Sequence, residues 1–376
     1  MKLMILAVWV TMAMTGSGAD LAPGVGRQWG VERSSYRDPV TGLRIVEITA
    51  AGVPADNLYY HFSNFTADNR YLIFQSKRTG TPQIYRYEAE SGAIVQLTND
   101  PEVAAATACP DPTEASRVYF MRGSELRALH VETFEQRVVG VVPGPGMGGY
   151  SQPSVSGDGK WVTVTKRPDE RTWEIGVIAA GTGEYRTVLR QGFRIGHVQH
   201  SPVSDSIFYV WETGGYAPQR SWVVRRDGTG NRPLYAPTDS KEWLTPQKEW
   251  LTHEAWVAGT GEMTMVNDKV GVMVVREDGT ARLVREGRYW HASARADGKY
   301  LALDDAQGRV WLAETATGNV RLLATGYRDA VRAVHGHLSF DRKGRFVQFH
   351  TGRRHETVAL IDLTQELGKE VYDLGR

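Results

Sequence analysis

The amino-acid sequence predicts an all-β fold, a seven-bladed β-propeller whose ring is closed by an N-terminal strand. Three observations lead to this prediction. A strand–turn–strand unit recurs seven times, with starts separated by 46, 44, 46, 56, 38 and 44 residues. Each unit continues with two further short strands joined by a Gly-containing turn. Four strands in about 40–45 residues is the spacing typical of one propeller blade.

The seven repeats share an apolar strand, a polar turn and a second apolar strand. They cover residues 61–74, 107–120, 151–164, 197–210, 253–266, 291–303 and 335–349. Asp-Gly and Thr-Gly pairs in the turns supply the positive φ that tight hairpins need. An earlier strand over residues 43–48 has no partner in the first repeat, so we expect it to pair into the last blade. An eight-bladed or split arrangement is the alternative.

The first residues have the pattern of a secretory signal peptide. Met1 and Lys2 provide a positive start, residues 3–15 are apolar, and residues 16–19 are small, as a cleavage site requires. The apolar stretch is too short to span a bilayer. We therefore expect residues 1–19 to be removed, residues 20–376 to form a single domain, and the mature protein to be periplasmic or secreted.

Charge and cysteine content exclude several classes of protein. Lys plus Arg number 44 against 43 for Asp plus Glu, which argues against nucleic acid or an anionic membrane as the main partner. The single cysteine, Cys109, cannot form an internal disulfide. The sequence has no Gly-x-Ser-x-Gly elbow, no P-loop and no Gly-x-Gly-x-x-Gly that opens a helix, which disfavours serine-hydrolase and nucleotide chemistry. No obligate protein partner is evident.

Histidines gather at one position of the repeats. Of the ten histidines, six fall at or just before the start of a repeat: His61, His197, His253, His291, His335 and His337. The first strand of each propeller blade lines the central axis, so we expect these imidazoles at one mouth of the channel. Chance placement would scatter them over all four strands. His200 lies slightly off this register.

His335 and His337 stand one residue apart, so on an extended strand their side chains point to the same face. With His291 from the adjacent blade they form a candidate three-nitrogen metal site with an open coordination position. The alternative is a set of polar side chains in a wet channel, hydrogen-bonded to the backbone.

Other residues could contribute chemistry at this mouth. His253 is a candidate proton acceptor because imidazole titrates near neutral pH, and the alternative is a core histidine packed against Trp256. His197 carries the same ambiguity. Arg220 could hold a carboxylate bidentately, or it could be a solvated surface charge. Aromatic residues could form walls for sugar rings or pack blades together: Tyr59, Tyr60, Trp211, Tyr216 and Trp290.

Several segments together resemble the oligogalacturonate lyase family. They are residues 36–42, Gly196-His197, residues 251–256 and residues 335–340, within a similarity that extends over residues 33–363. The Thr-His-Glu and His-x-His segments are the most specific, whereas Asp-Gly turns are shared with all propellers of the TolB type. The resemblance implies a seven-bladed propeller enzyme that cleaves short oligogalacturonides by β-elimination, helped by a manganese-type divalent ion.

The resemblance also implies residue roles. His291, His335 and His337 match the family's metal-binding histidines. His253 matches its proposed Brønsted base, and Arg220 matches its substrate-binding arginine. The family's remaining metal ligand is a glutamine, and Arg332 occupies that position here. From their places around the same mouth, further residues are expected to bind substrate: His197, His200, Arg332, Tyr60 and His61.

Arg332 leaves two arrangements open. A guanidinium stays protonated and cannot ligate a cation, so inside the channel it would itself face the substrate carboxylate. Pointing outward, it would leave the three histidines to hold the ion with water, Gln199 or Gln152. We favour the second arrangement because all three matching histidines are present. Two other functions remain open, a non-catalytic periplasmic TolB-like binding module and a lyase for a different uronate polymer.

Overall fold

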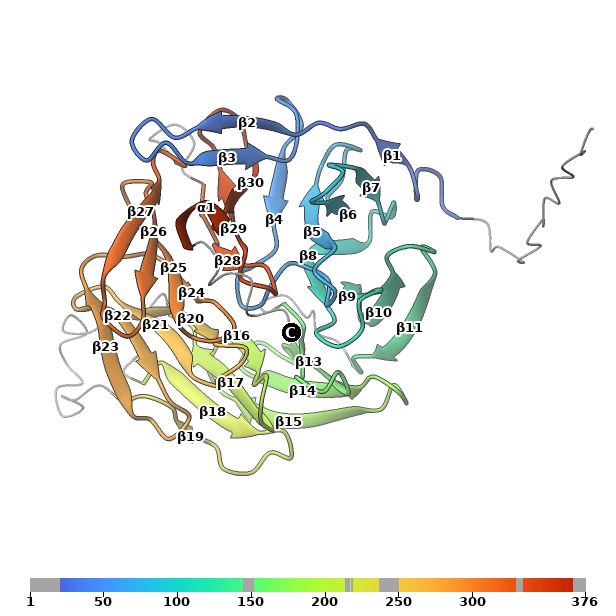
Figure 1. Cartoon of the computed structure of the whole chain (residues 1–376). Helices are drawn as coiled ribbons and strands as arrows, with labels where there is room; N and C mark the ends of the chain where they lie inside the picture. The colour runs from blue at the N-terminus through green and yellow to red at the C-terminus, as the bar shows by residue number, and fades with distance from the viewer. Residues whose placement is uncertain are drawn as a thin grey trace, which may run out of the picture.

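The computed structural model describes residues 21–144, 152–213, 217, 219–236, 250–328 and 334–367. Within these ranges thirty β-strands form seven antiparallel sheets, and one short helix, α1 (Thr364–Leu367), follows the last strand. Figure 1 shows the sheets as blades arranged in a ring around a common axis. The predicted all-β, seven-bladed propeller is therefore confirmed.

The first three blades follow one another along the chain. Blade one contains β1 (Gln28–Trp29), β4 (Ala55–Asn57), β5 (Tyr71–Ser76), β6 (Gln83–Glu88) and β7 (Ile94–Gln96). Blade two contains β8 (Val103–Pro110), β9 (Arg117–Arg122), β10 (Glu125–His130) and β11 (Gln136–Val141). Blade three contains β12 (Ser154–Val155), β13 (Trp161–Lys166), β14 (Trp173–Ala179) and β15 (Tyr185–Gln191).

The remaining four blades complete the ring. Blade four contains β16 (Ile195–His200), β17 (Ser206–Trp211), β18 (Ser221–Arg225) and β19 (Arg232–Pro233). Blade five contains β20 (Leu251–Trp256), β21 (Met263–Asn267), β22 (Gly271–Val275) and β23 (Ala281–Glu286). Blade six contains β24 (Ala292–Ala294), β25 (Tyr300–Asp304), β26 (Val310–Glu314) and β27 (Val320–Ala324). Blade seven contains β28 (Ser339–Phe340), β29 (Phe346–Thr351), β30 (Thr357–Asp362), β3 (Arg44–Glu47) and β2 (Ser34–Arg37).

The ring is closed by strands from both ends of the described chain. β3 pairs antiparallel with β30, placing Ile45 opposite Ile361, and β2 adds a fifth strand outside β3. This confirms that the strand predicted over residues 43–48 pairs into the last blade. β1 pairs with β7 and extends blade one, an addition that the sequence did not predict. Figure 1 shows blade seven beside blade one, where the two ends of the propeller meet.

The hydrophobic core consists of seven layers, one between each pair of neighbouring blades. Strand β5 shows the principle, because Tyr71 and Ile73 pack in the cluster shared with blade two, whereas Leu72 and Phe74 pack in the cluster shared with blade seven. Successive side chains of a strand point to opposite faces, so a strand between two layers is apolar on both. This explains why the inner strands read as continuous apolar runs in the sequence.

Several sequence predictions need correction or lie outside the described ranges. The first strand of blade one is β4, so His61 lies in the connection to β5 and does not begin a strand as predicted. His335 and His337 likewise precede β28. The predicted signal peptide (residues 1–19), Tyr216 and Arg332 are not among the residues that the structure describes. No helix in the described ranges is long and apolar enough to cross a membrane.

Candidate active site

Six histidines from five blades surround the start of the axial channel. The ring centroids of His253 and His291 are 4.2 Å apart, those of His291 and His337 are 5.2 Å apart, and those of His61 and His197 are 5.2 Å apart. The Tyr60 ring lies among them, 5.3 Å from His291 and 5.5 Å from His61. The structure thus brings together the histidines that the sequence placed at repeat starts.

The backbone is locally irregular where it presents these rings. Only five non-glycine residues in the described chain have positive φ, and three of them belong to the cluster: His197 (49°), His253 (55°) and His337 (43°). His197 and His253 lie at β-bulges, where the register of β16 on β17 and of β20 on β21 shifts. The left-handed region costs an ordinary residue roughly 1–2 kcal/mol, and such strain concentrates at functional sites. The bulges redirect both histidines from the regular strand pattern.

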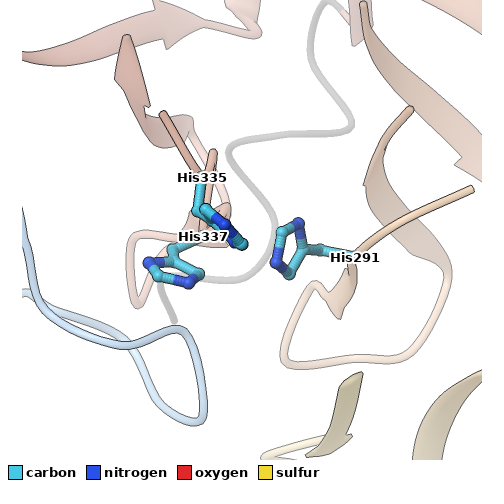
Figure 2. A group of neighbouring side chains, drawn as sticks. All are labelled: His291, His335 and His337. Carbon is cyan, nitrogen blue, oxygen red and sulfur yellow. The ribbon is translucent and has the colours of Figure 1, made fainter. Parts of the chain in front are cut away.

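His291, His335 and His337 form a group that could hold a metal ion. One nitrogen from each ring lies within 4.8 Å of the others. Figure 2 shows the three rings converging, His335 and His337 from the segment before β28 and His291 from the segment before β24. The prediction that His335 and His337 lie on one face of an extended strand is wrong, because this segment is not a strand and His337 has a φ of 43°. The two rings converge nonetheless.

A glycine between the two histidines lets this segment approach blade six closely. A Cβ atom on Gly336 would lie 2.6 Å from Asp304 Oδ2, a separation that real side chains do not adopt. On the other side, Asn57 Nδ2 donates a hydrogen bond of 2.8 Å to the carbonyl oxygen of His337. Contacts from blades one and six therefore set the path of the His-Gly-His segment.

A buried carboxylate orients the His291 ring. Nδ1 of His291 lies 2.9 Å from both oxygens of Asp304, and the His291 backbone N–H donates to Oδ1 at 2.7 Å. The Tyr327 hydroxyl donates to Oδ2 at 2.7 Å. Metal-binding histidines commonly donate their second nitrogen to a carboxylate in this way. No sequence pattern points to Asp304 or Tyr327, because Asp304 on β25 and Tyr327 in the loop after β27 meet only in the folded blade.

The remaining nitrogen of His291 is suited to a cation. His291 is fully buried, and its Nε2 has no hydrogen-bond partner in the described structure. A buried polar atom without a partner is unfavourable, and a bound ion would satisfy it. Burial lowers the pKa of both His335 and His337, and the nearby His291 lowers it further. Neutral imidazole is the form that ligates a metal, so the three residues fit such an ion.

His253 lies beside His291 and has a ring nitrogen that makes no hydrogen bond in the described structure. Its Nδ1 is buried without a hydrogen-bond partner among the described residues. Burial, followed by the charges of neighbouring His291 and His197, holds the pKa of His253 well below its usual range. The ring is therefore neutral at pH 7 and has a lone pair free to accept a proton.

Arg220 is a buried charge and not the solvated surface arginine that the sequence left open. Its Nε and Nη2 donate to Glu254 at 2.6 and 3.3 Å, and Nη1 lies 3.7 Å from Glu212. Nη1 has no hydrogen-bond partner in the described part of the chain. Glu254 thus occupies two of the guanidinium nitrogens, and Nη1 is the nitrogen left without a hydrogen bond in the described structure.

Glu254 links Arg220 to His197. His197 Nδ1 lies 3.2 Å from Glu254 Oε2, and the glutamate is fully buried. Burial alone would raise the pKa of this carboxyl, but the Arg220 guanidinium and the adjacent His197 hold it well below its usual range. Glu254 lies in the Thr-His-Glu segment, one of the most specific parts of the sequence resemblance. Only the fold shows that its carboxylate contacts Arg220 and His197.

A cavity of about 350 Å³ opens next to the cluster, lined by Asp56, Asn57, Tyr59, His61, Gln75, Ala106, Gln152, His197 and His337. Gln152 Oε1 is buried without a hydrogen-bond partner in the described structure, so Gln152 remains a possible additional ligand. Gln199 does not, because its amide donates to the carbonyl oxygen of Glu254 at 2.9 Å and its Oε1 accepts from the Trp256 N–H at 3.3 Å.

His200 does not join the other histidines. It is 4% exposed, its Nδ1 lies 3.0 Å from the Ser201 carbonyl oxygen, and it lines a separate cavity farther along the channel. His200 lies three positions after His197 on β16, so the strand carries it away from the cluster. Its predicted grouping with the substrate-binding residues at the first mouth is therefore corrected.

Comparison with known proteins confirms the resemblance seen in the sequence. An oligogalacturonate lyase of Dickeya dadantii (strain 3937) is 22% identical over 254 residues, 62% of this chain and 63% of the relative. An oligogalacturonide lyase of Pectobacterium atrosepticum is 21% identical over 252 residues, which again make up 62% of this chain and 63% of the relative. The matched region spans about 63% of the length of these curated relatives. No family model matches the chain.

Solved structures share the fold over a larger part of the chain. The crystal structure of an oligogalacturonate lyase from Vibrio parahaemolyticus has a TM-score of 0.79 at 18% identity, covering 90% of this chain and 98% of the other. An oligogalacturonate lyase in complex with manganese has a TM-score of 0.80 at 18% identity, covering 93% of this chain and all of the other (100%). At this identity the similarity demonstrates a common propeller fold.

The buried Arg220–Glu254 pair predicts a large stability effect. Replacing Glu254 by Gln should lower the free energy of unfolding at pH 7 by about 3–5 kcal/mol, because it leaves a buried guanidinium without its main partner. The folded-state pKa of Glu254 is lowered, so its contribution is present above the unfolded value of about 4.3 and is lost as the pH falls below it. Urea unfolding of the wild type and of Glu254→Gln, at pH 7 and at pH values below about 4.3, measures the loss of stability in the variant and the pH dependence of the wild type.

A matched control is Glu132→Gln, which removes a carboxylate paired with Arg70 at 2.8 Å where both side chains are about half exposed. This change should cost less than about 1 kcal/mol. An equal loss in the two variants would contradict the assigned role of Glu254.

Proposed function

We propose that this protein is a lyase that cleaves uronic-acid oligosaccharides, oligogalacturonides first among them, by β-elimination. One arrangement carries the proposal, a three-histidine group with nitrogens within 4.8 Å, placed directly beside His253. These are the residues that match the family's metal ligands and base. The names of the two curated relatives and the shared propeller fold support the same chemistry.

β-Elimination on a uronate requires three events. The proton on C5 passes to a base, the electron pair of that C–H bond forms a double bond between C5 and C4, and the bond from C4 to the leaving oxygen breaks. Positive charge at the substrate carboxylate makes the C5 proton more acidic by stabilising the enolate that develops. A divalent ion, manganese being our choice, would supply that charge when bound by His291, His335 and His337.

His253 is proposed as the base that accepts the C5 proton. It is neutral because burial lowers its pKa, and its Nδ1 has no other partner in the described structure. His253 and His291 belong to adjacent blades with ring centroids 4.2 Å apart, so a carboxylate near the three histidines would bring C5 toward His253. Proximity of this kind, more than base strength, would drive the transfer.

The other residues of the mouth have supporting roles in this proposal. Arg220 Nη1 would bind a substrate carboxylate or hydroxyl and position it, with Glu254 holding the guanidinium in place. Burial raises the pKa of both Tyr59 and Tyr60, so each keeps its proton and could donate it to the leaving oxygen. His61 and His197 complete the wall around the substrate. Export to the periplasm or cell exterior, expected from residues 1–19, stays a prediction.

The activity itself can be tested directly. Purified full-length protein incubated with oligogalacturonides and Mn²⁺ should produce the ultraviolet absorbance of an unsaturated uronate, and EDTA should abolish it. Absorbance only with glucuronate-containing oligosaccharides would favour a lyase for another uronate polymer. Binding of uronates without any product would instead favour the non-catalytic binding module. Activity that EDTA leaves unchanged would contradict the metal assignment and point to Arg332 as the cation.

Replacement of the proposed base should remove most of the rate. We expect His253→Ala to lower kcat about 10²–10⁴-fold, the usual contribution of general-base catalysis, with a smaller change in KM. His130→Ala is the control, because His130 lies on β10 and its Nδ1 accepts only from local backbone N–H groups. Full activity in His253→Ala, in protein with the wild-type melting temperature, would exclude the assignment.

The Asp304 carboxylate should control metal affinity through His291. Asp304→Asn keeps a hydrogen-bond acceptor but removes the charge, and loss of such a partner typically weakens metal binding about 10–100-fold. Titration calorimetry with Mn²⁺ measures this without any substrate. Asp305→Asn is the matched control, since Asp305 pairs with Arg309 at 2.7 Å and has no contact with His291 in the described structure. Equal affinity in the two variants would contradict the role of Asp304.

A further inference from the structure

The axial channel contains a second cavity, of about 240 Å³, beyond the histidine cluster. It is lined by residues from all seven blades, each on or just after the innermost strand of its blade. They include Pro110, Gly157, Pro202, Ala258, Ala296 and Arg342. His61 lines both cavities. On β16, His197 lines the first and His200 the second, and three residues of strand cover about 10 Å. The second cavity therefore occupies the opposite part of the channel.

A guanidinium lines this cavity without a carboxylate partner. Arg342 Nε donates to the Phe65 carbonyl oxygen at 3.0 Å, and Nη2 lies 3.5 Å from the carbonyl oxygens of Pro110 and Asp111. No acidic side chain in the described ranges forms an ion pair with Arg342, and its Nη1 has no hydrogen-bond acceptor there. Burial lowers the pKa of Arg342, but a guanidinium remains protonated at neutral pH.

The carboxylates of Asp111 and Asp341 both have other partners. Asp111 Oδ2 lies 3.3 Å from Arg117 Nη1, and its Oδ1 accepts backbone hydrogen bonds from Thr113 and Glu114. Asp341 accepts from Asn69 Nδ2 at 2.6 Å and from the Phe346 N–H at 2.7 Å. Neither acid forms an ion pair with Arg342 in the described structure, although the charge of Asp111 acts on the guanidinium and Asp341 also lines the cavity.

The rest of the lining combines polar side chains, among them His200, Ser154, Ser293, Ser339 and Asp341, with apolar walls. His200 is 4% exposed and its Nε2 has no hydrogen-bond partner in the described chain. Because Nδ1 lies 3.0 Å from the Ser201 carbonyl oxygen, Nδ1 carries the proton and Nε2 is an acceptor. Phe62, Val155, Trp256 and Phe340 contribute apolar surface. A ligand here would present one negative group to Arg342 and a compact apolar body to the walls.

We propose that this second cavity is a binding site for a small organic carboxylate, with Arg342 Nη1 as the anion-binding group. Arginine is well suited to a carboxylate because its planar N–H groups match the two oxygens. The cavity volume of about 240 Å³ is large enough for a single-ring carboxylate. Tyr60 and His61 of the proposed lyase site also line this cavity, but Arg342 has no role in the proposed elimination, so the anion site can be tested separately from the proposed activity.

Benzoate is a suitable probe because it combines a carboxylate with a compact apolar ring, and benzyl alcohol is its neutral counterpart. Titration calorimetry on the full-length protein, with EDTA present to exclude binding at a metal, should detect benzoate with a Kd of about 1 mM or tighter. Arg342→Gln should weaken it about 10–100-fold, the loss expected for a charged hydrogen bond. The matched control Arg328→Gln should have no effect, since that arginine stacks over Trp290 near the histidine cluster.

A second variant covers the case in which Arg342→Gln does not fold. Ala258 is exposed and lines the cavity, so Ala258→Phe should preserve the melting temperature while blocking benzoate. Three results would overturn the proposal: no benzoate binding in this range, benzyl alcohol binding as tightly as benzoate, or undiminished benzoate binding in folded Ala258→Phe.

Discussion

The pairing of β3 with β30 is the constraint on which the rest of the molecule depends. It connects a strand near residue 45 to one near residue 361, and so converts seven blades in a row into a closed ring. Blade seven carries His335 and His337 just before β28, and blade six carries His291 just before β24. The distance between these side chains is therefore set by how blades six and seven pack, and that packing includes Leu43, just before β3, and Ile45 on β3.

Around the channel, buried carboxylates hold the nitrogen-bearing side chains in place. Asp304 fixes the His291 ring, and Glu254 contacts both Arg220 and His197. A buried charge is unfavourable unless it is paired and hydrogen-bonded, so these contacts restrict each partner to one orientation. The left-handed backbone at three histidines adds local strain that the surrounding sheets must offset. Rigidity and strain together produce a preorganised mouth, as a catalytic site needs.

The two parts of the channel differ in the charge they present. The first contains several imidazoles that burial keeps neutral, which suits a divalent ion and a proton acceptor. The second contains the guanidinium of Arg342 with carbonyl partners, which suits an anion. His61 lines both cavities and, together with Tyr60, lies between the two sets of residues. One axial channel can thus hold two chemically different sites because each strand carries its side chains from one end toward the other.

The sequence by itself determined the number of blades, the closing strand and the histidines that gather at one mouth. These features depend on local patterns, namely alternating apolar runs, Gly-containing turns and a repeat of nearly constant length. The tertiary structure decided the rest. Glu254 and Asp304 acquire partners 34 and 13 residues away, and His337 is turned by a left-handed backbone that no strand pattern predicts. His200 follows the same strand as His197 but lines the other cavity, and Arg342 binds carbonyl groups of blades one and two more than 230 residues earlier in the chain. The Arg342 contacts arise only when the ring closes, because closure brings blade seven back to the first blades of the chain, whereas the Asp304 and Glu254 contacts form within blade six and between blades four and five.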